Sequence, residues 1–337
     1  MSKSANGQTI CLASGNYGAF SGGVKSSMTT IKPEDGATVT MALHFDPAAN
    51  ITVDGIRAGV DPAMGLGAFL NDSRTHDITV RNSVFDRAQV VMRTDSLPAN
   101  ANVLFDHNIH SNYVKCSNCY EGRVEVVGDH SSNGVTIQNS EFYGGNSDGI
   151  QDASNGTRIL NNEFHDMVQQ GTDVHADSIQ LMGSNTVIRG NYFHDNSVGI
   201  GSYDGADHTV VENNVFWAED PNKDVILGGN DTPVVRHNTL PGTIDLTSKA
   251  GQTTTNATST DNIAGSVQLS NGVGGDATTL ADDYNLLRDG GPGAHTITGS
   301  PTFVGGTNPT TRAGFALTSS SLGHAAADDG TDLGANP

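Results

Sequence analysis

Between residues 133 and 216 one eight-residue sequence motif occurs four times. Each copy alternates β-branched and polar residues and ends in Phe, and no helical period of 3.6 residues accompanies it. The copies are Val135-Thr-Ile-Gln-Asn-Ser-Glu-Phe142, Thr157-Arg-Ile-Leu-Asn-Asn-Glu-Phe164, Thr186-Val-Ile-Arg-Gly-Asn-Tyr-Phe193 and Thr209-Val-Val-Glu-Asn-Asn-Val-Phe216. Repeats of this kind predict a solenoid or a propeller.

Weaker copies extend the repeat on both sides. The markers, aligned on the second polar position of the motif, are Gly55, Ser83, Asn108, Ser140, Asn162, Asn191, Asn214, Asn238 and Asn262. Their spacing of 22 to 32 residues is too short for a propeller blade, which needs about 40–45 residues. It fits one turn of a parallel β-coil whose turns stack about 4.8 Å apart. We therefore predict an all-β, single-stranded parallel β-helix of about nine to eleven turns.

Stacked turns place equivalent residues in columns. We expect an inward aliphatic column at Ile137, Ile159, Ile188 and Val211, and a stacked aromatic core at Phe142, Phe164, Phe193 and Phe216. Asn139, Asn161 and Asn213 recur at the bend, where we expect their amides to satisfy the backbone of the next turn. These columns belong to the scaffold.

We predict one domain over residues 1–337. Residues 1–45 form an N-terminal cap and first strands, and residues 46–264 form the regular turns. In residues 265–337 the period fades into Gly, Thr and Asp, so we expect irregular turns and a wrap that covers the open end of the coil. Cys116 and Cys119 form a lone C-x-x-C, which predicts a local disulfide or two free thiols rather than a zinc site.

The net charge of −20 excludes nucleic acid as a default partner, because phosphate binding needs Lys and Arg. It also argues against an anionic membrane surface, and no apolar run approaches the length of a membrane span. The charge by itself is typical of a soluble, self-repelling surface. An acidic polymer as substrate would need a local basic pocket or a bridging cation.

The chain resembles the right-handed parallel β-helix proteins of the pectate-lyase-like superfamily. The Asn-Asn-x-Phe turns, the opening Gly7-Gln-Thr-Ile-Cys-Leu-Ala-Ser-Gly-Asn-Tyr17 and the closing Ser300-Pro-Thr-Phe303 and Asp332-Leu-Gly-Ala335 carry the resemblance. It implies a right-handed coil. It leaves the activity open, because that superfamily contains lyases, hydrolases, epimerases and phage adhesins. No secretory leader is visible, and we expect a secreted or periplasmic monomer whose signal peptide has been removed.

The residue after each core Phe forms a further column. It holds Tyr143, His165, His194 and Trp217, and the next positions are Gly144, Asp166, Asp195 and Ala218. Two His-Asp pairs therefore stack between aromatic rings, as a sugar-binding groove requires. The alternative is a surface ladder of rings without a ligand.

One interruption, residues 167–177, separates the second and third copies. Asp173, His175 and Asp177 alternate there, so they face one side if the segment is extended. The strand Asp177-Ser-Ile-Gln180 aligns with Asp148-Gly-Ile-Gln151 one turn earlier. We expect Asp148 and Asp177 to be neighbours, as carboxylates that share a proton or bind a cation. The alternative is a solvated loop with ordinary Asp residues.

The segment Asp173-x-His175-x-x-x-Ile179-x-Leu181 is also similar to the Asp-Pro-His-Glu catalytic segment of β-helical mannuronan epimerases. Val174 replaces the Pro and Ala176 replaces the Glu, so only Asp173 and His175 carry over. The resemblance implies chemistry at C5 of a uronate, which epimerases and lyases share.

A uronate lyase must neutralise the C6 carboxylate, remove the C5 proton and protonate the departing O4. We predict His175 or His194 as the base and Tyr203 or Tyr143 as the acid, with His165 and Asp177 completing the catalytic set. Ca²⁺ held by Asp148, Asp173 and Asp177 is the candidate cofactor, and no organic cofactor is expected. The predicted substrate-binding residues are Tyr143, Trp217, Gln151, Gln180, Asp195 and Lys223.

The sequence thus predicts a lyase that cleaves an acidic polysaccharide by β-elimination. A uronate C5-epimerase stays open, and so does a glycoside hydrolase, which would use carboxylates from Asp148, Asp166, Asp177 and Asp195. A non-enzymatic glycan-binding or adhesin β-helix is the alternative of another class. Arg189 and Arg236 flank Glu212 in one column, which predicts a surface charge ladder there.

Overall fold

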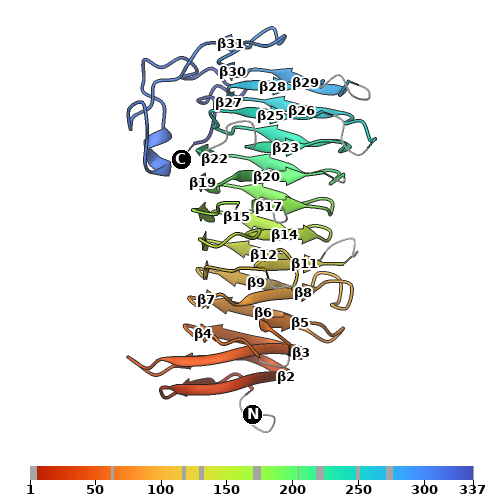
Figure 1. Cartoon of the computed structure of the whole chain (residues 1–337), viewed down its shortest axis with the longest axis vertical. Helices are drawn as coiled ribbons and strands as arrows, with labels where there is room; N and C mark the ends of the chain where they lie inside the picture. Colours follow the sequence, from red (N-terminus) through yellow and green to blue (C-terminus); the bar gives the residue numbers. More distant parts are fainter. Residues whose placement is uncertain are drawn as a thin grey trace. The chain divides into compact units, whose positions relative to one another are not determined.

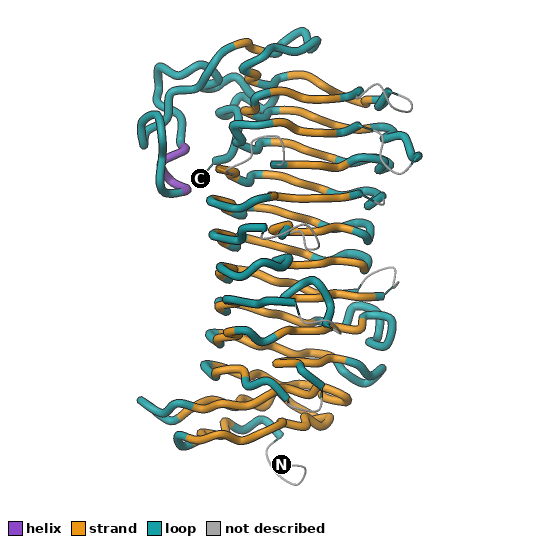
Figure 2. Tube along the Cα trace, viewed as in Figure 1, coloured by secondary structure: helices purple, strands orange, loops and turns teal. Residues whose placement is uncertain are grey.

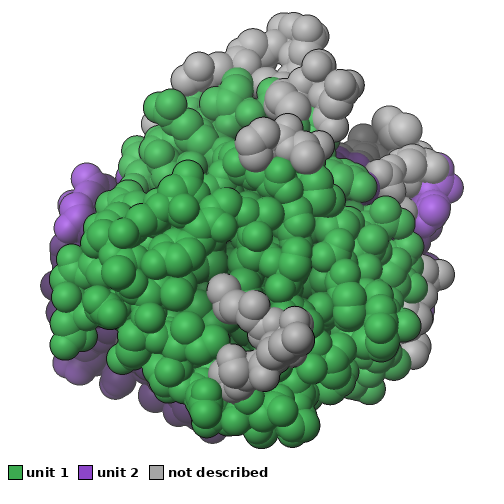
Figure 3. Space-filling view, turned by 90° about the horizontal axis from the view of Figure 1, so that it is seen from below, with its two compact units in different colours: residues 1–176 green, residues 177–337 purple. Residues whose placement is uncertain are grey.

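The computed structural model describes residues 6–61, 64–115, 119–128, 133–169, 176–203, 205–217, 224–247, 251–270 and 276–336. The chain divides into two compact units, residues 1–176 and residues 177–337 (Figure 3). The predicted single domain, with its boundaries near residues 45 and 264, stays a prediction.

Short parallel strands in three series build the first unit (Figure 1). β1 (Thr9–Leu12) and β2 (Gly15–Pro33) come first, and β2 pairs with β3 (Val39–Asp54). The first series continues from β3 through β6 (His76–Arg81), β9 (Val103–Asp106), β12 (Val135–Gln138) and β15 (Arg158–Leu160). The second is β4 (Arg57–Ala58), β7 (Val84–Asp86), β10 (Ile109–Ser111), β13 (Glu141–Tyr143) and β16 (Glu163–His165). The third is β5 (Leu66–Leu70), β8 (Gln89–Arg93), β11 (Val124–Val127) and β14 (Ile150–Ala153).

The second unit has the same three series. The first is β18 (Val187–Arg189), β21 (Val210–Glu212), β24 (Val234–Arg236), β26 (Ala257–Thr260) and β29 (Thr279–Asp283). The second is β19 (Tyr192–His194), β22 (Val215–Trp217), β27 (Ile263–Ala264), β30 (Leu286–Leu287) and β31 (Ile297–Thr298). The third is β17 (Asp177–Leu181), β20 (Val198–Ser202), β23 (Val225–Leu227), β25 (Thr243–Asp245) and β28 (Ser266–Gln268). Figure 2 shows strands and turns throughout, with one helical segment among the described residues, η2 (Arg312–Phe315).

The predicted columns are confirmed within each unit. Ile137 pairs with Ile159, and Phe142 pairs with Phe164 at 4.7 Å between ring centroids. In the second unit Phe193 stacks on Phe216 at 4.5 Å. All these side chains are buried, because alternating strands send every second residue inward and parallel stacking superimposes equivalent positions.

The asparagine ladder lies one position later than predicted. Asn139 and Asn161, and likewise Asn213, have positive φ and supply the left-handed bend. The side chains that accept from the backbone of the neighbouring turn belong to the next residue, which is buried. In the second unit each backbone N–H in the run donates to the side-chain oxygen of the next member at 2.9–3.0 Å, along Asn191, Asn214, Asn238, Asn262 and Asn285.

The C-terminal wrap packs along the side of the second unit. The expectation that it covers the open end of the coil stays a prediction. Phe315 and Ala335 form a buried cluster with Tyr192 and Val215 of β19 and β22. The backbone N–H of Ala335 donates to the Thr239 hydroxyl at 2.9 Å. The apolar side chains of the wrap therefore complete the core on this side. No helix among the described residues is long and apolar enough to cross a membrane.

Candidate functional site

The ladder predicted after the core Phe column exists in both units. Tyr143 pairs with His165, and their rings stack at 5.2 Å and 11°. His194 pairs with Trp217 in the second unit. The ladder also begins earlier than the sequence analysis placed it, because Asp86 and Ser111 occupy the same register as Tyr143. The residue that directly follows a ladder position has positive φ in several turns. These residues are Arg87, Asn112, Gly144, Asp166 and Asp195.

His165 is held by carboxylates at both ring nitrogens. Its Nδ1 lies 2.7 Å from Asp166 and its Nε2 lies 3.0 Å from Glu141. Burial is the largest single influence and lowers the pKa of His165, but the hydrogen bonds and charges of Asp166 and Glu141 together raise it above its ordinary value. This environment favours the imidazolium, which suits His165 as a fixed cation rather than as a base.

His194 repeats this arrangement in part. Its Nδ1 lies 2.8 Å from Asp195, and the Tyr192 ring lies 4.6 Å from the imidazole. The imidazole is partly buried, whereas the Asp195 carboxylate is largely exposed. A polymer on this face would therefore meet the carboxylate before the ring.

A cavity of about 430 Å³ adjoins the ladder in the first unit, lined by Arg87, Asn112, Val114 and Gly145. Arg87 is exposed and forms no salt bridge with a described residue, and the same holds for Arg57. Hydrogen bonding from Asn112 is the largest cause that lowers the pKa of Asp86, and both guanidinium charges contribute. Two arginines therefore gather around one carboxylate beside a cavity.

Arg57 and Arg87 were not among the residues predicted from the sequence. Arg87 follows Phe85 by two positions, as Gly144 follows Phe142 and Asp166 follows Phe164. Extending the column alignment to the weak copy at residues 78–85 would have revealed it. Arg57 carries no such signal, because it lies in a two-residue strand without a core Phe.

The segment between β10 and β11 builds the cavity wall. This segment was not predicted as functional, although the 32-residue interval from Asn108 to Ser140 is the longest in the repeat. Tyr113 is buried and donates to the Tyr120 carbonyl at 3.0 Å, and Cys119 is disulfide-bonded. Cys116 lies outside the described residues. These contacts hold the exposed Val114 at the cavity.

Buried Arg123 anchors the turn under the cavity. Its guanidinium donates to five backbone carbonyls at 2.6–3.4 Å, those of His110, Tyr143, Gly144, Ser147 and Asp148. Burial lowers the pKa of Arg123 to about 10, partly offset by the charges of Asp148 and Tyr113. The group remains a cation at neutral pH, and its planar fork fixes the backbone from Tyr143 to Asp148.

Four predicted site residues have little or no exposed surface in the structure. Asp148 is fully buried in the first unit and Asp177 in the second. Gln151 is 7% exposed and Gln180 is 8% exposed. The roles predicted for these four residues stay predictions. Among the described residues, no three His, Cys, Asp or Glu side chains are grouped to hold a metal ion.

Three predicted site residues, Asp173, His175 and Lys223, lie outside the described residues, so their roles and the calcium site stay predictions. Tyr203 lies over Gly201, where an added Cβ would sit 2.8 Å from the tyrosine ring. Trp217 is partly buried and contacts Phe315 at 5.3 Å. Packing contacts therefore help to fix the positions of the Tyr203 and Trp217 rings.

The charge ladder on β18, β21 and β24 is confirmed. Glu212 binds Arg189 and, at 2.7 Å, Arg236. Burial raises the pKa of Glu212, but the hydrogen bonds and charges of the two arginines more than offset it and lower the pKa overall. These two arginines are therefore paired with Glu212 on the surface of the coil.

The fold defines the class of protein: a right-handed parallel β-helix. The family described as right handed beta helix region matches residues 124–279. No curated protein matches the chain.

Three solved structures are similar to this chain at low identity. A mutant of the PL6 family alginate lyase AlyGC is 14% identical, with a TM-score of 0.50, and the match covers 99% of this chain and 57% of that one. The chain thus spans little more than half of that lyase. Pectate lyase Pel9A is 13% identical, with a TM-score of 0.48 and coverage of 98% and 88%. The surface adhesin PfbA of Streptococcus pneumoniae is 13% identical, with a TM-score of 0.45 and coverage of 82% and 81%.

Proposed function

We propose that the protein is a polysaccharide lyase that cleaves a uronate-containing polymer by β-elimination. The observation that carries the proposal is Arg87, an exposed arginine without a salt bridge to any described residue. It lines a cavity together with Gly145, which follows Tyr143 by two positions. The shared fold with an alginate lyase is compatible with this activity but does not by itself carry it.

The arginines supply the charge that an acidic substrate needs. The protein carries a net charge of −20, which repels a polyanion over most of its surface. Arg57 and Arg87 concentrate positive charge at one place on the ladder. A guanidinium can bind a carboxylate through two parallel hydrogen bonds. We assign Arg87 to the C6 carboxylate, where it stabilises the charge that develops when the C5 proton leaves.

Tyr143 is the proton-transfer group that the geometry favours. Its ring stacks on His165, whose nitrogens are both engaged by carboxylates, so the phenol is the group of this pair left to exchange a proton with substrate. The backbone of Tyr143 is fixed by Arg123. The second proton-transfer role stays with His175, the predicted candidate from the same unit.

The predicted location, oligomeric state and calcium ion form part of this proposal. A polymeric substrate favours a secreted or periplasmic enzyme, and one active face per chain is compatible with a monomer. Ca²⁺ at Asp148, Asp173 and Asp177 would offset substrate charge, but the burial of Asp148 and Asp177 gives Arg87 the better access.

The test is the absorbance near 235 nm that an unsaturated uronate produces. Purified protein is incubated with alginate, polygalacturonate and a uronate-containing glycosaminoglycan, with and without EDTA. We expect absorbance to rise with one of these polymers and Tyr143→Phe to lower the rate by about 100-fold or more. His76→Ala changes an exposed ring away from the cavity and should retain the rate. Absence of the signal with every polymer contradicts the proposal.

A non-enzymatic glycan-binding protein is the second candidate. It is favoured by the engaged nitrogens of His165 and the buried carboxylates of Asp148 and Asp177, which reduce the titratable groups open to substrate. Polymer binding without absorbance or new reducing ends would support it. New reducing ends without absorbance would indicate a hydrolase that uses exposed carboxylates such as Asp166 and Asp195.

A further inference from the structure

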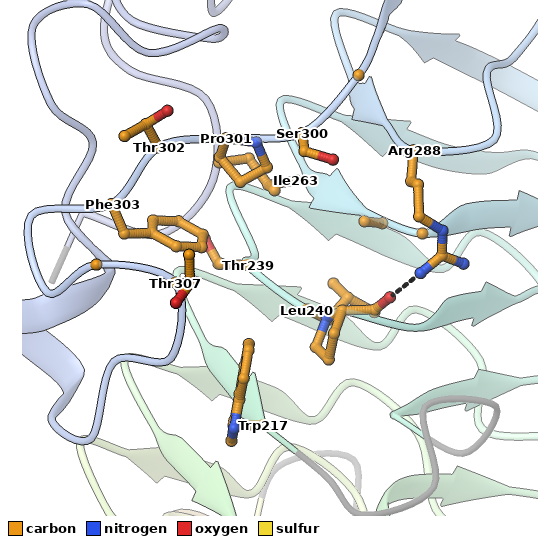
Figure 4. Close-up of a pocket in the computed structure, with 15 residues that line it drawn as sticks. Trp217, Thr239, Leu240, Ile263, Arg288, Ser300, Pro301, Thr302, Phe303 and Thr307 are labelled. Atoms are coloured by element: carbon orange, nitrogen blue, oxygen red, sulfur yellow. Dashed lines mark hydrogen bonds between the residues drawn. The ribbon is translucent and has the colours of Figure 1, made fainter.

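A cavity of about 410 Å³ lies in the second unit, between the ends of its second strand series and the segment 299–307 (Figure 4). Trp217, Pro241 and Gly265 contribute from the strand side, together with Arg288. Ser300, Thr302, Phe303 and Thr307 contribute from the opposite segment. None of its lining residues lines the cavity at Arg87, and its role does not depend on the proposed lyase activity.

The strand side of the cavity is one register column. Val215 bridges Thr239, Thr239 bridges Ile263, and Ile263 pairs with Leu286. Two positions after each of these come Trp217, Pro241, Gly265 and Arg288. Successive turns thus present an indole, a pyrrolidine ring, a bare backbone and a guanidinium in one line. Gly265 leaves this line open, since an added Cβ would lie 2.8 Å from the Pro241 carbonyl and 2.9 Å from Arg288.

The opposite wall is held in place by backbone hydrogen bonds. The Gly299 N–H donates to the Leu287 carbonyl at 3.0 Å, and the Thr302 N–H donates to the Ser321 hydroxyl at 2.7 Å. The Val304 N–H donates to the Ala316 carbonyl at 2.8 Å. These bonds tie the segment both to the strands and to the wrap. The cavity is therefore formed before a ligand arrives, as is usual for small-molecule sites.

The lining combines ring faces with hydroxyl groups. Trp217 contacts Phe315 at 5.3 Å and also reaches the cavity, where Phe303 and Pro241 add apolar surface. Ser300, Thr302 and Thr307 are exposed at the rim and carry hydroxyls. A pyranose has an apolar C–H face and a rim of hydroxyls, so it complements this lining.

The charge of Arg288 is already balanced. Its guanidinium donates to Asp289 at 3.0 and 3.1 Å and to the Pro241 carbonyl at 3.1 Å. The site therefore does not demand an anionic ligand. Its volume lies within the range of about 300–1,000 Å³ typical of small-molecule sites. We propose that this cavity is a non-catalytic saccharide-binding site that takes the terminal one or two pyranose rings of a glycan chain.

The protein offers a direct reporter, because Trp217 is its only tryptophan. The full-length protein is titrated with short neutral oligosaccharides (cello- and manno-oligosaccharides) and with short uronate oligosaccharides, while tryptophan fluorescence is recorded. We expect a saturable change of intensity or a blue shift with at least one of them. The two arms distinguish a neutral from an acidic glycan end.

Two cavity variants test the location. Ser300→Tyr fills the cavity and should abolish the change. Thr302→Ala removes one hydroxyl and should weaken binding about fivefold, the effect of one neutral hydrogen bond. Thr310→Ala, an exposed threonine of the same wrap outside the cavity, should bind as the unmodified protein does. If Ser300→Tyr does not fold, Thr302→Ala decides the question alone.

Arg87→Ala separates this inference from the proposed function. That variant should leave the fluorescence titration unchanged even though it lowers lyase activity. No saturable change with any oligosaccharide overturns the inference, and so does a change that Ser300→Tyr or Thr302→Ala leaves intact. Either result would leave the lyase proposal standing.

Discussion

The imidazole of His110 stacks on the ring of Phe142 with centroids 4.6 Å apart and 7° between planes. Phe85 covers the other face at 4.8 Å. His110 therefore takes the place of a phenylalanine in the aromatic column of the first unit. It is fully buried, and neither ring nitrogen forms a hydrogen bond with a described residue.

His110→Phe should stabilise the protein. Restoring an apolar ring removes the cost of burying two unsatisfied ring nitrogens, which is about 1–3 kcal/mol. Urea denaturation at pH 7 measures the free energy of unfolding. His110→Ala is the contrasting variant and should destabilise, because it leaves a void between two rings. Equal or lower stability of His110→Phe would contradict this account.

The lowered pKa of buried His110 should also make the protein less stable in acid. Burial, with a smaller contribution from the Arg123 charge, lowers the pKa of His110 to about 3. The unfolded histidine titrates near 6.5, so between these values the unfolded state binds a proton that the native state does not. Stability should therefore fall as the pH drops below about 6.5, by at most about 1.4 kcal/mol per pH unit.

The control for this pH effect is His110→Phe itself, which should lose that part of the pH dependence. Denaturation midpoints for both proteins between pH 4 and pH 7 provide the comparison. Parallel curves would show that other groups cause the acid sensitivity.

The raised pKa of Glu125 should give the free energy of unfolding the opposite pH dependence. Burial is the main cause that raises the pKa of Glu125 to about 8, and the charges of Asp148, Glu121 and Asp152 add to it. The unfolded state releases its proton near pH 4.3, so the native state binds more protons between that value and 8. Stability from this group should be greatest below about pH 4.3 and should decline as the pH rises toward 8.

Glu125→Gln keeps a side chain that can accept from the Gly122 N–H, as Glu125 does at 3.1 Å, and cannot ionise. We expect this variant to gain stability relative to the unmodified protein as the pH rises from 5 to 8. Glu163→Gln changes an exposed glutamate on β16 and should show no such trend. A gain that does not depend on pH would rule out ionisation as the cause.

Arg123→Met should destabilise the protein by about 3 kcal/mol or more, because it leaves several buried carbonyls without a donor. The loss of these hydrogen bonds should also distort the cavity near Tyr143. The activity should therefore fall by more than the increase in unfolded protein explains. Arg123→Lys keeps a cation but not the planar fork, and should recover part of the loss. Arg93→Met, which removes an exposed pair with Asp95, should cost about 1 kcal/mol or less.

Arg87→Ala should reduce kcat/KM on the acidic polymer by about 10- to 100-fold, the range expected for one hydrogen-bonded charge. Steady-state absorbance kinetics measure this ratio. Arg81→Ala, which removes an exposed arginine paired with Asp54, is the matched control and should leave kcat/KM unchanged. An Arg87→Ala enzyme with full kcat/KM would remove Arg87 from the site.

The repeat determined the scaffold, because a parallel coil stacks equivalent residues at constant register. The Phe142–Phe164 and Ile137–Ile159 pairs, and the Tyr143–His165 ladder, follow from spacing alone. The same logic would have found Arg87, had the column been extended to Phe85. Within the repeat, sequence position and spatial position carry the same information.

Outside the repeat that equivalence ends. The inward turn of Asp148 and Asp177, the guanidinium of Arg123 beneath Tyr143, and the path of the wrap to Tyr192 depend on contacts between residues far apart in sequence. The period cannot encode these contacts, since they arise where loops of unequal length fold back on the turns. The sequence therefore determined the coil and its columns, while only the tertiary structure decided which side chains reach solvent and where the cavities lie.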